Sequence, residues 1–161
     1  MEGKNEHGET GATVLREVTI VVFDQPPRKG NSRIIATRGK GGRPFLPKSK
    51  KAQAYEKHFK EQTEHMGSPM LGGKDKLLIV EGSAFYKNKF VADLSIELVL
   101  DCMTKSGIIV DDRYVVKHNV DKKWDKENPR VELVVREIDE KEYQWATGIM
   151  SNTLQSKKQK K

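Results

Sequence analysis

Apolar residues follow two spacings along this chain, and Gly and Pro separate the segments that carry them. Runs of β-branched residues that stop at turn residues predict strands, whereas apolar positions three or four residues apart predict helices. Two helices are expected, one from about Lys50 to His65 after the capping residue Ser49, the other from about Asp93 to Lys105 before Gly107. The expected strands span residues 16–23, 77–90, 114–120 and 131–138, with at most a further short strand at 34–37 in the Gly- and Pro-rich loop 28–48.

The order of these elements predicts an α+β fold, with a small mixed or antiparallel sheet and two main helices. We expect the long strand to be weakened or bulged at Gly82. One domain over residues 15–140 is expected, preceded by a polar, disordered extension at 1–14 and followed by a weak helix and a lysine-rich tail at 141–161. The residues expected to face the core are Ala52, Tyr55 and Phe59 on the first helix, and Ile96, Val99, Leu100 and Met103 on the second.

The composition is that of a non-membrane protein without disulfides. Its 161 residues correspond to about one domain at ~150 residues each. No apolar run approaches the ~20 residues that a membrane span needs, and the first residues lack the apolar stretch of a signal peptide. Cys102 is the only cysteine, which excludes an intramolecular disulfide and a Cys-X-X-Cys metal knuckle. We therefore expect a cytoplasmic protein with no membrane partner.

Positive charge is concentrated in one segment. The chain has a net charge of +7, but residues 24–60 carry +9, so the remainder is at about −2. Such a local excess is typical of a protein that binds a polyanion; a basic surface in contact only with solvent is the alternative. Because the basic residues lie among Gly, Pro and Asn rather than beside acids at helical spacing, nucleic acid is the favoured partner. The expected nucleic-acid-binding residues are Arg28, Lys29, Asn31, Arg33, Arg43, Lys48, Lys50 and Lys51.

Acidic residues recur in the second half of the chain. Asp93, Glu97 and Asp101 are four residues apart, which places them near one face of the second expected helix. Asp111-Asp112 follow after a turn that can bring them near the helix start. An acidic face in contact with solvent is the alternative. Carboxylates that converge from a helix and a loop are the ligands that Mg²⁺ prefers, with Mn²⁺ as a second candidate. Because such a metal can polarise a phosphodiester and supply hydroxide, the sequence predicts metal-dependent cleavage of nucleic acid.

Other residue types are less informative. The four histidines are scattered and are expected to be ordinary surface or half-buried side chains. Residues 39–42 (GKGG) lack the spacing of a P-loop. Trp124 and Trp145 offer ring faces on which bases could stack, although packing against the core is the commoner fate of a tryptophan in a small domain.

Several short stretches share their order and spacing with a known family. The stretches are PPRKGNSR (26–33), GRPFL (42–46), SKKAQAYE (49–56), ADLS (92–95), DCM (101–103), SGIIVDD (106–112) and RVELVVREI (130–138). Together they resemble the RusA family of phage and prophage Holliday junction resolvases, over roughly residues 16–138. Each motif is short, so the specificity of the resemblance lies in their combination.

The resemblance implies a small α+β homodimer that binds branched DNA, in particular four-way junctions, and makes symmetric nicks with Mg²⁺ held by aspartates. It also implies a protein encoded by a phage or prophage and active in the cytoplasm of a bacterial host cell. Aligned residue by residue, Asp112 falls on a catalytic aspartate, Asp93 on the second aspartate of the family's Asp-X-Asp pair, and Glu97 on a catalytic lysine position that is Glu in one branch. The expected metal ligands are then Asp93, Asp112 and Asp111.

The chain departs from the family pattern at one position. The first aspartate of the Asp-X-Asp pair falls on Val91, whose side chain has no ligand atom. Alternatively, Asp93-Leu94-Ser95 corresponds to the Asp-Leu-Ser form of this motif in the family, and the chain then lacks two residues of the helix that follows. Two other functions therefore stay open: a family member that binds branched DNA without cleaving it, and a basic module that binds RNA or an acidic protein.

Overall fold

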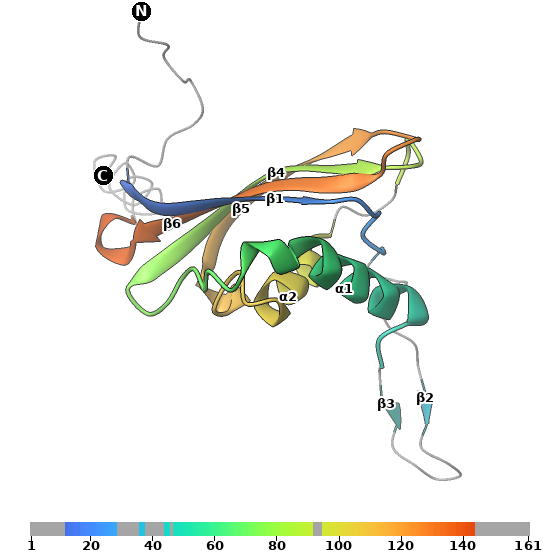
Figure 1. The fold of residues 1–161 in the computed structure, drawn as a ribbon, viewed down its shortest axis with the longest axis horizontal. Coiled ribbons are helices and arrows are strands. Elements are labelled where there is room, and N and C mark those ends of the chain that lie inside the picture. Colours follow the sequence, from blue (N-terminus) through green and yellow to red (C-terminus); the bar gives the residue numbers. More distant parts are fainter. Residues whose placement is uncertain (1–11, 29–35, 38–43, 46, 92–94, 144–161) are drawn as a thin grey trace, which may run out of the picture.

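A computed structural model describes residues 12–28, 36–37, 44–45, 47–91 and 95–143 of the chain, and Figure 1 shows its elements. The strands are β1 (Val14–Val22), β2 (Ala36–Thr37), β3 (Pro44–Phe45), β4 (Lys76–Tyr86), β5 (Val115–Trp124) and β6 (Arg130–Asp139). The helices are α1 (Lys50–Thr63) and α2 (Glu97–Lys105), with short 3₁₀ turns at η2 (Glu64–Met66), η3 (Asp112–Tyr114) and η4 (Glu140–Glu142).

Four of these strands form one mixed sheet in the order β1-β6-β4-β5. β6 pairs antiparallel with β1 and β4, whereas β4 and β5 are parallel and are connected through α2. Both helices lie on the same face of the sheet, and β2 and β3 form a separate antiparallel ribbon beyond the first turn of α1 (Figure 1). The predicted α+β class, with a mixed sheet and two helices, is confirmed.

The core lies between the sheet and the two helices. Residues that face the helices alternate along the strands, as the pleat requires, and Ile20 of β1 and Val135 of β6 are fully buried there. The predicted helical faces are confirmed. The residues buried from α1 are Ala52, Tyr55 and Phe59, and those from α2 and its start are Ile96, Val99 and Met103, with Leu100 half-buried against the same cluster.

The opposite face of the sheet is polar. Arg136 of β6 donates to Glu17 of β1 (Nε–Oε2 2.7 Å) and also pairs with Glu81 of β4. A sheet with one face packed and the other in contact with water gives this alternation of apolar and charged positions. At one end of this face a small buried cluster contains Leu77, Ile79 and Ile138.

Some predicted boundaries differ from the structure. β4 ends at Tyr86 rather than at residue 90, and β5 continues to Trp124 rather than ending at 120. α2 begins at Glu97, because the preceding Ile96 has a non-helical backbone (φ −102°, ψ 4°) and its side chain is buried. The prediction that one helix carries Asp93, Glu97 and Asp101 is therefore wrong at its start. Asp93 itself lies outside the described residues.

Gly82 does not form the predicted bulge. β4 keeps a continuous register with β5 and β6 across this residue, and the irregularity lies instead between Leu78 and Ile79, opposite β5. Glycine is required here for another reason. The residue has φ +148°, and a Cβ would lie 2.0 Å from the carbonyl oxygen of Glu132. The close approach of β6 therefore excludes any side chain at this position.

The predicted domain boundaries are only partly covered by the described residues. Residues 1–11 and 144–161 lie outside them, so the predicted extension and tail stay predictions. Val14 already belongs to β1, and the chain after β6 makes the 3₁₀ turn η4. Within the described ranges, no helix is long and apolar enough to span a membrane.

A buried carboxylate ties three parts of the fold together. Among the described residues, Glu137 of β6 is the only charged side chain that is buried, with 0% exposure. Arg16 of β1 donates to both of its oxygens (Nε–Oε1 2.9 Å, Nη2–Oε2 2.7 Å), and the Gly72 amide donates to Oε2 at 2.8 Å. The same guanidinium donates to the carbonyls of Pro69 and Met70. The hydrogen bonds from Arg16 hold the pKa of Glu137 below its ordinary value.

Glu137→Ala is expected to lower the free energy of unfolding by about 2–4 kcal/mol, because it removes the partner of Arg16 and leaves the Gly72 amide without an acceptor. The folded-state pKa of Glu137 is depressed, so its charge stabilises the fold above the unfolded pKa of ~4.3 and stops doing so as pH falls through the folded pKa. The free energy of unfolding of Glu137→Gln should therefore be lower than that of the wild type at pH 7 and closer to it in acid. Urea denaturation at both pH values measures this.

Glu61→Gln is the matched control, since Glu61 is exposed and its one ion-pair partner among the described residues is Lys57, one helical turn away. Its expected effect is below about 0.5 kcal/mol. If Glu137→Ala has the same free energy of unfolding as the wild type at pH 7, the buried carboxylate does not stabilise the fold.

Candidate nucleic-acid and metal site

The first turn of α1 carries positive charge where a helix usually prefers negative charge. Ser49 caps the helix by accepting a hydrogen bond from the Ala52 amide (N–Oγ 3.2 Å), as predicted. Lys50 and Lys51 follow and are exposed, and within the described ranges neither ammonium has an ion-pair partner. A helix N-terminus has partial positive charge. Two exposed lysines there add to this charge, so this end of α1 is suited to an anion such as phosphate.

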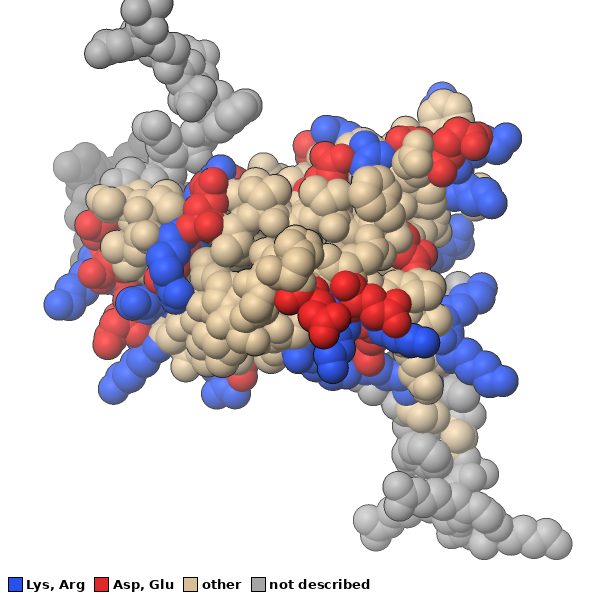
Figure 2. All heavy atoms as spheres, in the orientation of Figure 1, with Lys and Arg blue, Asp and Glu red and all other residues tan. Residues whose placement is uncertain are grey.

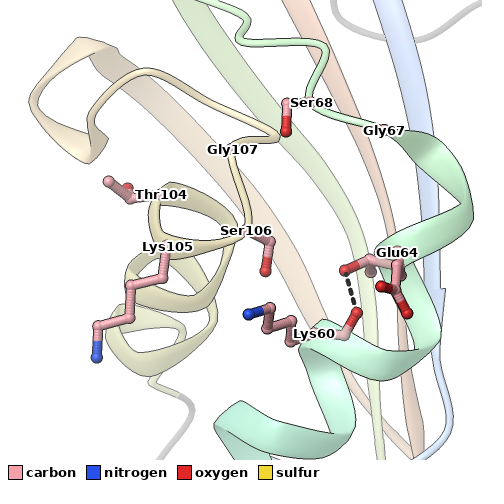
Figure 3. Close-up of a pocket in the computed structure, with 9 residues that line it drawn as sticks. Lys60, Glu64, Gly67, Ser68, Thr104, Lys105, Ser106 and Gly107 are labelled. Atoms are coloured by element: carbon pink, nitrogen blue, oxygen red, sulfur yellow. Dashed lines mark hydrogen bonds between the residues drawn. The ribbon is translucent and has the colours of Figure 1, made fainter.

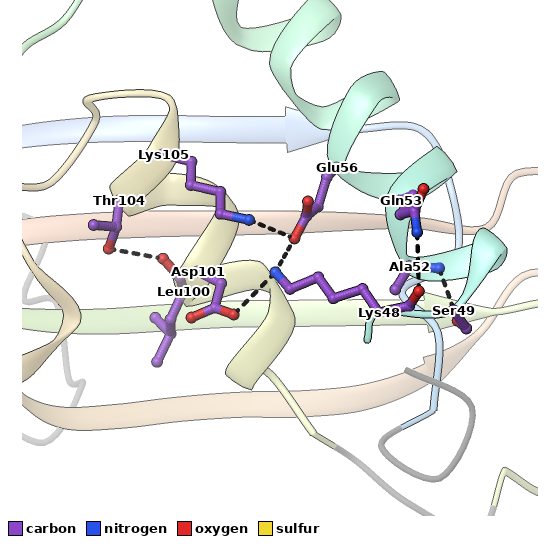
Figure 4. Close-up of polar contacts among 9 residues, drawn as sticks. All are labelled: Lys48, Ser49, Ala52, Gln53, Glu56, Leu100, Asp101, Thr104 and Lys105. Atoms are coloured by element: carbon purple, nitrogen blue, oxygen red, sulfur yellow. Dashed lines mark hydrogen bonds and ion pairs between the residues drawn. The ribbon is translucent and has the colours of Figure 1, made fainter. Parts of the chain in front are cut away.

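Lys48, one residue before the cap, instead points between the two helices (Figure 4). Its ammonium contacts Glu56 of α1 and lies 3.3 Å from Oδ2 of Asp101 of α2. Lys105 of α2 also donates to Glu56, with an Nζ–Oε1 distance of 3.0 Å. The Lys48 and Glu56 side chains are each only 20% exposed. Four alternating charges therefore bridge α1 and α2, and we call them the interhelical network.

The interhelical network keeps its members charged. Burial would lower the pKa of Lys48, but the hydrogen bonds with Glu56 and Asp101 outweigh it and the pKa is raised. Burial would likewise raise the pKa of Glu56, but its two lysine partners bring it below the ordinary value. The role of Lys48 in binding nucleic acid stays a prediction. Because two carboxylates already hold its ammonium, we expect it to contribute less to phosphate binding than Lys50 and Lys51.

The network also joins two segments that are far apart in the sequence. Glu56 is in the stretch 49–56 of the family resemblance and Asp101 is in the stretch 101–103, whereas Lys48 and Lys105 lie just outside these stretches. Lys48 and Asp101 are 53 positions apart. Figure 2, in the orientation of Figure 1, shows acidic side chains gathered near the middle of the visible face, with basic side chains directly beside them. Sequence reasoning missed the network, because no local pattern signals an ion pair across such a separation.

A pocket lies where the C-terminal ends of α1 and α2 meet (Figure 3). Its volume is about 370 Å³, and Lys60 extends across it toward Ser106. Helix C-termini carry partial negative charge, which repels an anion. This pocket is therefore less suited to phosphate than the first turn of α1. The lining residues are Lys60, Thr63, Glu64, Gly67, Ser68, Thr104, Lys105, Ser106 and Gly107.

The acidic pair after α2 divides into two roles. Asp111 caps η3, where its Oδ1 accepts from the Arg113 amide at 2.9 Å and its Oδ2 lies 2.8 Å from the Arg113 guanidinium. The hydrogen bond from the Arg113 side chain is the main reason that the pKa of Asp111 falls to about 2. Asp112 is exposed and begins η3, which packs next to α2. Asp111 is therefore held by local structure, and Asp112 is the better placed of the two to meet a ligand.

The described residues do not complete a metal site. Within those ranges, no three His, Cys, Asp or Glu side chains lie close enough together to hold an ion, so Glu97, Asp111 and Asp112 do not form a group by themselves. Carboxylates are the right donors for Mg²⁺, and the predicted third ligand, Asp93, falls outside the described residues. Val91 is in the hydrophobic core, with 2% exposure.

The predicted nucleic-acid-binding residues are also only partly described. Arg28, Lys48, Lys50 and Lys51 are described, whereas Lys29, Asn31, Arg33 and Arg43 lie outside the described ranges. The described members do not act alike, because Lys48 points into the interhelical network while Lys50 and Lys51 point to solvent.

Comparisons with known proteins give no further support. No protein-family model matches this chain, and no curated protein matches it significantly. The family resemblance therefore rests on the quoted stretches alone.

The interhelical network predicts that Lys48 and its neighbours have separable roles. Lys48→Met keeps the apolar stem and removes the charge. It should lower the free energy of unfolding by about 1–2 kcal/mol, because Glu56 and Asp101 lose a half-buried partner. Lys51→Met should change it by less than about 0.5 kcal/mol, since the side chain is exposed. Urea denaturation at neutral pH measures both, and equal effects of the two substitutions would contradict a structural role for Lys48.

Proposed function

We propose that this protein is a Mg²⁺-dependent endonuclease that acts on branched DNA, in particular on four-way junctions in recombination and repair. It would work as a homodimer in the cytoplasm of a bacterial host, encoded by a phage or prophage. A two-fold dimer suits a four-way junction, because each protomer meets one of two equivalent strands. Mn²⁺ is an alternative metal.

The observation that carries this proposal is that α1, which contains most of the stretch 49–56 of the resemblance, packs against α2, which contains the stretch 101–103. Lys48 and Asp101 are 3.3 Å apart, although 53 positions separate them. The contact holds the phosphate-suited first turn of α1 against the helix that leads to Asp112. A basic and an acidic region on adjoining helices support an enzyme that binds a phosphodiester beside a metal.

The roles of the residues follow from these positions. Lys50 and Lys51 bind backbone phosphates, together with Arg28 and the basic residues that follow it. Asp112 and Asp93 hold the metal, with Glu97 at the start of α2 as a further candidate. When bound, the metal would polarise a phosphoryl oxygen and lower the pKa of a coordinated water. The interhelical network positions the phosphate-binding turn and does not touch the reacting atoms.

A second candidate function is binding of branched DNA without cleavage. The observation that favours it is the burial of Val91, which occupies an aspartate position of the family pattern and packs in the core. With fewer carboxylates, the protein would grip the junction through the basic residues and leave its phosphodiesters intact. Incubating a labelled four-way junction with the protein, in Mg²⁺ and in EDTA, separates the two candidates.

Asp112→Asn is expected to abolish nicking of the junction and to preserve binding, because it removes one carboxylate from the metal and adds no bulk. Asp75→Asn, an exposed aspartate before β4, is the control and should cleave as the wild type does. Gel analysis of the labelled strands measures cleavage, and a mobility shift in EDTA measures binding. If Asp112→Asn still nicks the junction, Asp112 is not a metal ligand of the site. If the wild type binds the junction without metal and never nicks it, the second candidate function is favoured.

The dependence of affinity on salt should report the number of phosphates contacted. If roughly six phosphates are neutralised, the slope of log K against log salt is expected to be about −5 for duplex arms. Replacing both Lys50 and Lys51 with Ala should make the slope shallower by nearly 2. Lys141→Ala, an exposed lysine in η4, is the control and should leave the slope unchanged. An affinity that does not respond to salt would overturn the electrostatic assignment.

A further inference from the structure

Two aromatic side chains are exposed at one end of the sheet, where β4 and β5 finish side by side. Phe90, in the segment that follows β4, is 86% exposed, and Trp124, the last residue of β5, is 56% exposed. Trp124 lies opposite Tyr86, the last residue of β4, and Figure 1 shows the two strands ending together. Large apolar side chains exposed next to one another and rimmed by charge mark an interaction surface.

The charge around these rings is mainly positive. The Lys89 ammonium lies 5.8 Å from the centre of the Phe90 ring and 5.9 Å from that of Trp124, so both rings share one cation. Asp125, which follows Trp124, is paired with Arg130 at 2.7 Å. Two further exposed lysines flank the rings in the sequence, Lys87 and Lys122. Lys123 points to the other face of β5, where its ammonium lies 5.6 Å from the centre of the Phe85 ring.

The segment that carries Phe90 is held in place from β5. The indole Nε1 of Trp124 donates to the Lys87 carbonyl at 3.2 Å, and the Lys122 ammonium donates to the Val91 carbonyl at 2.7 Å. The two bonds fix the chain on both sides of Phe90 and orient the indole. A surface that is already ordered loses less conformational entropy when it binds a partner.

We propose that Phe90 and Trp124 form a stacking surface for unpaired bases of a nucleic acid. Every base has a π-face that stacks on an aromatic ring, and lysines beside the rings contact the backbone, so this combination binds single strands with little sequence preference. An acidic peptide would use the lysines but leave the two ring faces without a role.

The inference rests on the nucleic-acid partner proposed above and adds which part of the DNA this end of the protein binds. Duplex phosphates account for the lysines of α1, but a duplex keeps its bases stacked on one another. Unpaired bases occur where strands exchange or fray at a branch point.

The test uses the full chain with Trp145→Phe, which leaves Trp124 as the only tryptophan. It is titrated with oligo(dT) of about 12 nucleotides, within the usual site sizes of ~4–16, and with a duplex of the same length. Stacking should quench the Trp124 fluorescence with oligo(dT), with much less change on the duplex at equal saturation. Anisotropy of labelled DNA measures the saturation independently.

Phe90→Ala and Trp124→Ala should each weaken oligo(dT) binding by about fivefold or more, since stacking contributes ~1–3 kcal/mol per base. Trp124→Phe should retain most of the affinity, because a phenyl ring also stacks. Leu15→Ala is the control, since Leu15 is similarly apolar and half-exposed but lies near the opposite end of the sheet. Urea midpoints check that each variant folds, and the fluorescence titration does not depend on the alanine variants.

The outcomes separate this inference from the proposed nuclease. Unchanged oligo(dT) affinity in both alanine variants, or no oligo(dT) binding, overturns the stacking surface, while cleavage of the junction would still support the enzyme. Quenching by oligo(dT) together with lost affinity in the alanine variants supports the stacking surface even if the junction is never cut. If these variants instead lose affinity only for an acidic peptide, the surface serves a protein and the inference is overturned.

Discussion

A carboxylate buried in the sheet positions the chain that leads to the candidate site. The charge of Glu137 can remain inside the protein because Arg16 and the Gly72 amide bond to its oxygens and the Lys76 ammonium lies 3.8 Å from Oε1. These bonds fix the turn before β4. Leu71 in that turn donates to the Ile108 carbonyl at 2.9 Å and accepts from the Val110 amide at 2.8 Å. The segment that enters the acidic pair at 111–112 is therefore anchored, through one turn, to the inner strand β6.

The two helices divide the basic charge between structure and surface. The +9 of residues 24–60 overstates what a partner meets, because Lys48 is held by Glu56 and Asp101. Lys50 and Lys51 point to solvent at the capped end of α1, where the helix adds its own partial positive charge. In the interhelical network, Lys48 pairs with carboxylates and so fixes the orientation of the turn that carries Lys50 and Lys51. Specificity for phosphate would come from this geometry as much as from the amount of charge.

The candidate functional regions are spread along the molecule. β5 runs for ten residues between η3 and Trp124, which at about 3.3 Å per residue is roughly 33 Å. Asp112 and the exposed aromatic rings therefore lie at opposite ends of one strand. The backbone of a DNA duplex advances about 3.4 Å per base pair, so an arm of roughly ten base pairs covers this length. A large, branched ligand fits such a separation better than a small substrate that must meet all the groups at once.

The sequence by itself determined the features that depend on neighbouring residues: the class of fold, most strands, the buried faces of both helices and the Ser49 cap. Each of these follows from spacing or from contacts within one helical turn. Only the tertiary structure decided the features that depend on distant partners. Gly82 is required by the backbone of β6, Lys48 is claimed by a residue 53 positions away, and Glu137 is buried because β1 supplies an arginine. Trp124 is exposed although a core position was the commoner expectation, because it ends an edge strand. Local propensity carries no information about which strand or loop will lie opposite a residue, and those neighbours set its burial, its partners and its charge.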